Sequence, residues 1–261
     1  MVIDTCKEKQ SSYDPSNRMP LLLETFASRD SLKQRRGRAG RVRPGTCYKL
    51  ISKEKFGKLP EHGVPEIKRC ALDQTLLSLL FLGIEKSSGS FLSKLLDPPS
   101  QMSINAAVFS LEKLGAISSY EDTLTLTPLG MHLAAIPAPP AVGKMLVMGS
   151  LLGCRSASLA LAAGMSVGRS PFLQIRSSQH NYNNEQDEQA AKEEMKNEMI
   201  LQERKKMFDS VGNSDLALLA AVYMKWDAIK GGGGEKRRFC GSIGLSINGV
   251  RDMKQLVSQL E

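Results

Sequence analysis

The pattern of apolar and polar positions changes near residue 65 of this 261-residue chain. Before that point, apolar residues come in short runs separated by turn-forming residues, which is typical of strands. Residues 7–13 and 19–26 predict a β-hairpin, because Asp14-Pro15-Ser16-Asn17 between them has turn chemistry. Two further strands are expected, a short buried one at residues 2–3 and another at 46–51.

After residue 65, apolar residues recur at helical spacing. Leu72, Leu76, Leu79 and Leu80 share one helix face, and residues 104–114 repeat the pattern. Ser100 can cap the start of that second helix and Gly115 its end. Two short strands are expected at residues 116–118 and 124–126, followed by a helix that begins at Thr127-Pro128. Helices followed by a two-stranded hairpin describe a winged helix.

Beyond Pro140 the chain predicts a helical bundle. One apolar face carries Ala141, Met145, Met148 and Leu152, and another carries Leu216, Leu219, Ala220 and Tyr223. The charged stretch 174–212 between them is expected to be a solvated loop or a surface helix, with no assigned function. The glycine run 231–234 is expected to be a flexible loop, and Tyr223 and Trp226 are expected in the core.

Composition favours an intracellular protein with polyanionic partners. The net charge is +8 and the pI is about 9.3, with 41% hydrophobic residues. No apolar run is long enough for a membrane span, and the N-terminus does not resemble a signal peptide. The five cysteines lack C-x-x-C spacing, so neither structural zinc nor a disulfide framework is expected, and no metal site is assigned to this chain.

Residues 34–41 carry the strongest chemical signal, because they combine a glutamine, several arginines and small spacers within what reads as one tight turn. Guanidinium groups bind phosphate oxygens bidentately, and small residues let a ligand approach the backbone. A polyphosphate is the natural ligand, especially at a helix N-terminus or turn between strands. A solvated nucleic-acid patch or a nuclear import signal is the alternative.

The same stretch resembles the sixth motif, QRxGRAGR, of the DEAH/RHA group of superfamily 2 RNA helicases. Other segments are similar to that family in the same order: Val64–Arg69 to its PEIxR segment, then Asp97-Pro98-Pro99, Leu126–Gly130 and Ser170-Pro171-Phe172. The resemblance implies a mixed α/β and α fold: a partial RecA-like α/β domain, a winged helix, and a helical bundle called the ratchet. The implied domains are 1–62, 63–136 and 137–261, the last with a charged insertion at about 174–212.

By resemblance, Arg41 is the arginine finger, Arg38 its partner on the γ-phosphate, and Gln34 orients the attacking water or the phosphate. Gly37 and Gly40 would allow the turn that completes the nucleotide site. The hairpin at residues 7–26 would face nucleic acid, which makes Lys7, Lys9 and Arg18 candidate RNA contacts. The implied cofactor is ATP with Mg²⁺.

The chain contains neither a Gly-x-x-x-x-Gly-Lys-Ser/Thr phosphate loop nor an Asp-Glu-Ala-His motif. We therefore expect the C-terminal half of an ATP-dependent RNA helicase, inactive alone, whose magnesium ligands lie on a missing N-terminal RecA1 lobe in the same or another chain. An activating adaptor protein is a possible partner, and the cytoplasm is favoured over the nucleus. Two alternatives stay open: a non-catalytic RNA-binding or adaptor module, and a winged-helix DNA-binding protein. The second is disfavoured by the series of helicase-like motifs. The helix at 104–114 is also poor in base-reading residues, with Asn105 and Lys113 as its main polar candidates.

Overall fold

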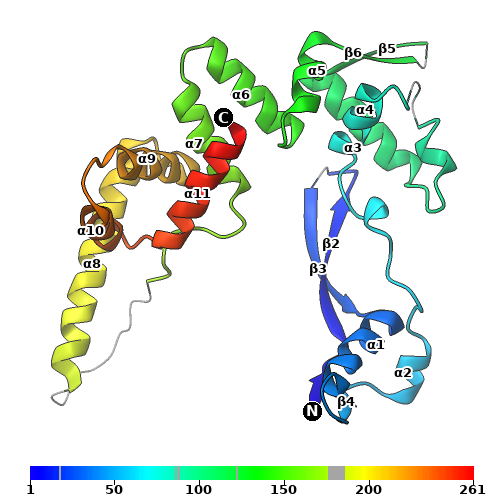
Figure 1. Cartoon of the computed structure of the whole chain (residues 1–261), viewed down its shortest axis with the longest axis horizontal. Coiled ribbons are helices and arrows are strands. Elements are labelled where there is room, and N and C mark those ends of the chain that lie inside the picture. The colour runs from blue at the N-terminus through cyan, green and yellow to red at the C-terminus, as the bar shows by residue number, and fades with distance from the viewer. Residues whose placement is uncertain (18, 86, 88, 122, 176–185) are drawn as a thin grey trace. The chain divides into compact units, whose positions relative to one another are not determined.

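The computed structural model describes the chain except residues 18, 86, 88, 122 and 176–185, and it divides into two compact units, Met1–Ala135 and Ile136–Glu261 (Figure 1). The first unit combines three small sheets with short helices, and the second is a bundle of helices. This confirms the expected mixture of α/β and helical parts. No helix in the described part of the chain is both long and apolar enough to span a bilayer.

The strands of the first unit lie largely where the apolar pattern placed them. Strand β1 (Val2–Asp4) pairs in parallel with β4 (Cys47–Lys49), and β2 (Lys7–Asp14) pairs antiparallel with β3 (Met19–Phe26). The prediction that β1 is buried is wrong for Ile3, which is 62% exposed. The buried residue of this strand is Asp4, whose carboxylate accepts hydrogen bonds from the Cys6 N–H and from Arg35.

The hairpin turn has the chemistry predicted for it. The Asp14 carboxylate accepts hydrogen bonds from the Asn17 side chain at 2.8 Å and from the Ser16 backbone N–H at 2.9 Å. These bonds lower the pKa of Asp14, the Asn17 bond most. Along β2, the Ser11 carbonyl accepts from Arg69 at 3.0 Å, so the segment after the hairpin is tied to it.

Helix α1 (Arg29–Gly37) follows the hairpin directly and continues into a 3₁₀ turn, η1 (Arg38–Gly40). Ser28 caps α1 by accepting from the Ser31 N–H. The small core beneath this helix contains Cys6, Ala27, Leu32 and Leu59. Helix α2 (Lys53–Gly57) is the last helix before residue 60, and its Phe56 packs against this core.

The rest of the first unit has the predicted order of helices and strands, with both helix caps confirmed. Ser100 accepts from the Ser103 N–H at 3.1 Å, and Gly115 ends α4 with a φ of 75°. Thr127 caps the last helix by accepting from the Gly130 N–H at 3.0 Å. The elements are η2 (Glu66–Lys68), α3 (Asp73–Phe81), η3 (Leu92–Lys94), α4 (Gln101–Leu114), β5 (Ile117–Tyr120), β6 (Thr123–Leu126) and α5 (Pro128–Ala135).

The second unit is built from helices α6 to α11 around a core that includes Tyr223 and Trp226, 6% and 5% exposed, as predicted. Its six helices in the described residues are α6 (Pro140–Leu151), α7 (Arg155–Ser166), α8 (Gln186–Ser210), α9 (Asp215–Ala228), α10 (Gly233–Ile243) and α11 (Ile247–Leu260).

Two expectations for this unit are wrong. The buried face of α6 carries Val142 and Leu146, whereas Met148 is 38% exposed and Leu152 is 79% exposed. The glycine run is also not a loop throughout, because α10 begins at Gly233. A Cβ at Gly231 would lie 1.6 Å from the Glu235 carboxylate, so the carboxylate folds back over the helix start where glycine leaves room.

The charged stretch 174–212 forms a helix, α8, over its second half, while residues 176–185 lie outside the described residues. A surface helix was one of the two expectations for it. However, the C-terminal half of α8 is not merely solvated, since Ile200 is 8% exposed and Met207 and Phe208 pack against the core.

Candidate phosphate-binding site and nucleic-acid surface

The arginine-rich stretch occupies the C-terminal end of α1 and the turn η1, not a single tight turn. Gln34 and Gly37 are in the last turn of α1, and Arg38 and Gly40 are in η1. Of the two expected settings, a helix N-terminus or a turn between strands, the first is wrong, and η1 is a turn that lies between β3 and β4 along the chain. The partial negative charge at a helix C-terminus favours guanidinium groups there but does not attract an anion. Any anion at this place must be held by side chains.

Arg38 and Arg41 are exposed, and their guanidinium groups form no hydrogen bond or ion pair with any described residue. Gln34 and Arg36 are also exposed and unpaired within the described part of the chain. No fold interaction therefore competes for these groups, and two charged guanidiniums three residues apart can both donate to one phosphate.

The glycines of the stretch are not explained by the fold of this chain. Gly37 has a helical φ of −59°, and neither Gly37 nor Gly40 is among the positive-φ glycines. A Cβ added at either would meet no atom within 4 Å. At both positions the backbone is therefore open to close approach by another molecule.

Gly45, in contrast, is required by packing. A Cβ there would lie 2.1 Å from the backbone oxygen of Ala39, so the loop after the motif folds back onto η1. This contact fixes the turn that carries Arg38 and Arg41.

Arg35 has a separate, structural role that the sequence did not reveal. Its guanidinium donates to Asp4 at 3.2 Å, to the Lys7 carbonyl at 3.0 Å and to Glu8 at 3.0 Å. Asp4 also accepts from the Cys6 N–H at 2.9 Å, and burial raises the pKa of the Cys6 thiol. Arg35 thus joins α1 to β1 and to the base of the hairpin.

The three candidate RNA contacts on the hairpin differ in their surroundings. Lys7 donates to Glu24 on the opposite strand at 2.6 Å, and this bond lowers the pKa of Glu24. Lys9 is exposed and lies opposite Glu24 in the hairpin, where its charge also helps to lower the pKa of Glu24, but its ammonium group forms no hydrogen bond with a described residue. Arg18 lies outside the described residues. The structure therefore leaves Lys9 more available to a ligand than Lys7.

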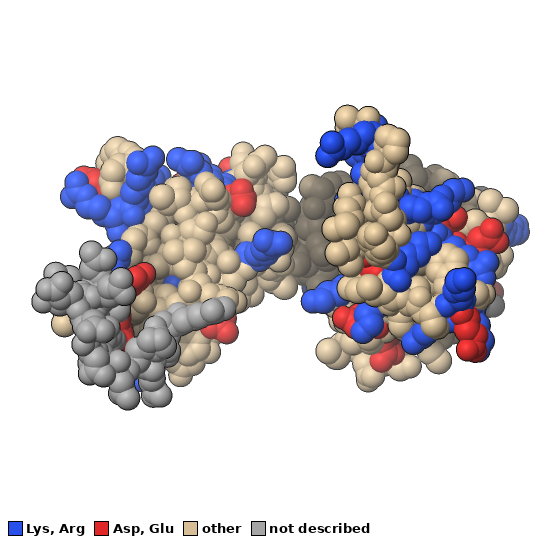
Figure 2. All heavy atoms as spheres, turned by 90° about the horizontal axis from the view of Figure 1, so that it is seen from below, with Lys and Arg blue, Asp and Glu red and all other residues tan. Residues whose placement is uncertain are grey.

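Basic residues are spread widely over the surface. Figure 2 shows Lys and Arg side chains across the visible face of the first unit, interspersed with Asp and Glu. Among the described residues, no group of three or more His, Cys, Asp or Glu side chains could hold a metal ion.

In the second unit, Arg204 is another residue that the sequence did not single out. Its guanidinium donates to the carbonyls of Ile243 at 2.7 Å, Gly244 at 2.6 Å and Leu173 at 3.1 Å. It also stacks over the Phe172 ring, 4.8 Å from the ring centroid. Sequence reasoning missed it because its partners are about 30 to 40 residues away and are mostly backbone atoms, which leave no pattern in the sequence.

Comparison with known proteins identifies the class. The helicase associated domain (HA2), ratchet-like, matches residues 139–219. The chain belongs to the DEAH-type helicases of superfamily 2 and corresponds to their C-terminal region, which confirms the resemblance seen in the motifs.

Three relatives illustrate the match. The DExH-box ATP-dependent RNA helicase DExH4, chloroplastic, from Arabidopsis thaliana is 35% identical over 257 residues, covering 97% of this chain and 17% of that protein. DExH1 from the same organism is 36% identical over 258 residues, covering 99% and 23%. The ATP-dependent RNA helicase DHX29 of Homo sapiens is 43% identical over 171 residues, covering 66% and 12%. The chain thus spans less than a quarter of the length of each.

Proposed function

We propose that this chain is the C-terminal part of an intracellular ATP-dependent RNA helicase that couples ATP hydrolysis to movement on, or remodelling of, RNA. Residues 1–62 would form the end of the second RecA-like domain, 63–136 a winged helix, and 137–261 the ratchet. The names of the relatives and the HA2 match support this proposal. The order of strands and helices in the first unit fits the first two domains.

Within this proposal, Arg41 acts as the arginine finger and Arg38 as its partner, both donating to the γ-phosphate of ATP. Gln34 orients the attacking water or that phosphate, and Gly37 and Gly40 leave room for the triphosphate. The observation that carries these roles is that both guanidiniums are exposed and unpaired in the described structure, beside two glycines with open space.

The other half of the nucleotide site would come from a RecA1 lobe. Phosphoryl transfer requires a phosphate cradle and a magnesium site in addition to transition-state cations. This chain has free cations but neither helicase motif that would supply the other two parts. ATP with Mg²⁺ would thus bind between the lobes, and the chain alone would not hydrolyse it. RNA would contact the hairpin through Lys9, and Lys7 and Arg18 remain candidates for the same role. An adaptor protein would regulate turnover.

The alternative is a non-catalytic RNA-binding or adaptor module. It is favoured by the same missing motifs, and it predicts that the free arginines serve RNA binding and not hydrolysis.

The two functions are separated by Arg41→Ala in the helicase that contains this region together with its RecA1 lobe. We expect RNA-stimulated ATP hydrolysis to fall by about 10³-fold or more, the range measured for arginine fingers, with RNA binding nearly unchanged. Arg43→Ala is the matched control, because Arg43 is also exposed and lies two residues outside the motif. Normal hydrolysis by Arg41→Ala would refute the assignment. If the unmutated protein binds RNA but shows no RNA-stimulated hydrolysis, and Arg41→Ala weakens RNA binding, the adaptor module is supported.

A further inference from the structure

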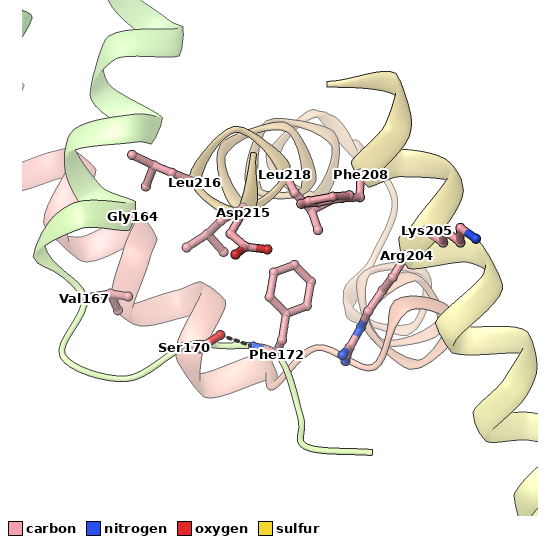
Figure 3. A pocket seen from close by; sticks show the side chains of 11 residues that line it. Gly164, Val167, Ser170, Phe172, Arg204, Lys205, Phe208, Asp215, Leu216 and Leu218 are labelled. Atoms are coloured by element: carbon pink, nitrogen blue, oxygen red, sulfur yellow. Dashed lines mark hydrogen bonds between the residues drawn. The ribbon is translucent and has the colours of Figure 1, made fainter. Parts of the chain in front are cut away.

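A cavity of about 780 Å³ lies within the second unit, between the end of α7, the loop after it, α8 and the start of α9. Its walls combine an aromatic ring, apolar side chains, a carboxylate and a lysine (Figure 3). Cavities of roughly 300–1,000 Å³ with mostly apolar walls and a few polar groups are typical of small-ligand sites. The lining residues that matter here are Phe172, Leu216, Asp215, Lys205 and Arg204.

Phe172 is a partly buried cavity residue that packs against the core of the second unit, so its ring is held in place before any ligand binds. Its neighbours Pro171 and Leu173 are tied to the turn between α10 and α11, through Ser246 N–H to the Pro171 carbonyl and Leu173 N–H to the Gly244 carbonyl, both at 2.8 Å. The stacked Arg204 braces the ring, and its guanidinium is itself fixed by three carbonyls. A ring fixed in advance loses little conformational freedom when a ligand stacks on it.

Asp215 adds a free hydrogen-bond acceptor beside this ring. In Figure 3 its carboxylate lies next to Phe172, inside the cavity lining. The carboxylate has no partner among the described residues. It is not needed as the cap of α9, because Ser214 already accepts from the Ala217 N–H at 3.3 Å. Lys205, exposed on α8, places a cation at the same cavity.

These side chains fit a flat ligand whose face stacks on Phe172 and whose edge donates hydrogen bonds to Asp215. A negative charge elsewhere on the ligand would fit Lys205. Nucleobases stack on aromatic rings, and of the four bases guanine offers two adjacent donors, N1–H and N2–H, to a carboxylate. The phosphate of the same nucleotide would suit Lys205. An arginine side chain could also stack and pair with Asp215. It is disfavoured because Arg204 already holds a cation against the same ring.

We propose that this cavity binds a guanine base of single-stranded RNA, stacked on Phe172 and paired through its N1–H and N2–H to Asp215. The proposal deepens the proposed function, since it rests on RNA being the ligand, and it gives the ratchet unit a base preference of its own.

The test measures binding of the 261-residue chain to two fluorescent oligomers, a short oligouridylate and the same strand with one central guanosine. We expect the guanosine strand to bind about tenfold more tightly, as for a bidentate contact to one base. Asp215→Asn should abolish this preference, because an amide offers one acceptor oxygen where the carboxylate offers two. Asp209→Asn is the matched control: it makes the same change of charge at an exposed, unpaired α8 residue that does not line the cavity.

A strand in which inosine replaces guanosine tests the geometry. Inosine lacks the N2 amino group, so it should lose most of the preference. Phe172→Leu should weaken both strands by about tenfold, because stacking does not depend on the base. The Phe172→Leu comparison requires that this variant unfolds at the same temperature as the wild type. The Asp215→Asn test stands without it, because Phe172 is unchanged in that variant.

Each remaining outcome contradicts one proposal. Equal binding of both strands by the wild-type chain would overturn the guanine site while RNA binding stands. Equal effects of Asp215→Asn and Asp209→Asn would do the same, since the preference would then be a charge effect. If no strand binds, RNA contact by this region fails. The cavity is then tested with guanosine monophosphate by saturation-transfer NMR. A saturation-transfer signal that Asp215→Asn removes supports the site. No signal, or a signal that survives Asp215→Asn, overturns it. Crosslinking of the cavity to another protein segment in the intact helicase would identify a protein occupant and overturn it as well.

Discussion

The contact of Arg35 with Asp4 and Glu8 gives the most direct test of how the arginine-rich helix is held. Arg35→Met keeps most of the aliphatic length but removes the charge and three hydrogen bonds. The Asp4 side chain is 5% exposed, so without Arg35 its carboxylate would be buried with only the Cys6 N–H as a partner. We expect the base of the hairpin to separate more readily from α1.

The magnitude follows from burial. Breaking a fully buried ion pair costs about 3–5 kcal/mol. The Arg35 side chain is 30% exposed, so water screens part of the interaction, and we expect about 2 kcal/mol. This corresponds to an increase of about 30-fold in the opening equilibrium.

Amide hydrogen exchange of peptides from residues 1–40 measures that opening locally, which suits a chain of two units better than one global unfolding curve. Arg36→Met is the control, because Arg36 is exposed and has no partner among the described residues, and we expect no change. Asp4→Asn combined with Arg35→Met should restore much of the protection, since it removes the unpaired buried charge. Equal exchange in the Arg35 and Arg36 variants would show that Arg35 does not hold the hairpin.

Three other expectations test packing and burial. Gly149→Ala should destabilise it by about 2–4 kcal/mol in urea unfolding, because the new Cβ would lie 1.8 Å from the Ser158 hydroxyl, whereas Gly241→Ala, with open space, should be neutral or stabilising. Burial raises the pKa of Tyr223 to about 12, so its phenol stays protonated in the fold after the unfolded form ionises near pH 10. Stability should therefore fall by about 2–3 kcal/mol between pH 10 and 12, and Tyr223→Phe should remove that part of the fall. A thiol reagent should modify the exposed Cys154 first and the two buried thiols only on unfolding; rapid reaction of all would contradict the burial.

The sequence predicted those features that depend on neighbouring residues. Ser100 and Gly115 mark the two ends of α4 because a cap is chosen within one turn of the helix. The Asp14 turn is equally local. The HA2 match bears out the family resemblance, while the roles of Arg38 and Arg41 stay predictions.

The errors have a common physical origin in contacts over long range. On α6, small residues at helical spacing did not show which side would meet α7, and Met148 was placed on the wrong face. Gly233 was predicted to be in a loop because glycine runs are typical of flexible linkers, yet packing of the Glu235 carboxylate on the preceding backbone accompanies a helix start there. The structural roles of Arg35 and Arg204 were not predicted, because the residues that they contact are dispersed along the chain.

The hydrogen bonds of Arg204 to three backbone carbonyls also bear on how this region can evolve. Its bonds to residues 173, 243 and 244 are made from near the C-terminal end of α8, so they fix where that helix finishes but not how long it is. Residues added or lost at the other end of α8 would leave Arg204 in place. We therefore expect changes of length in the first half of the charged stretch to leave these three hydrogen bonds intact.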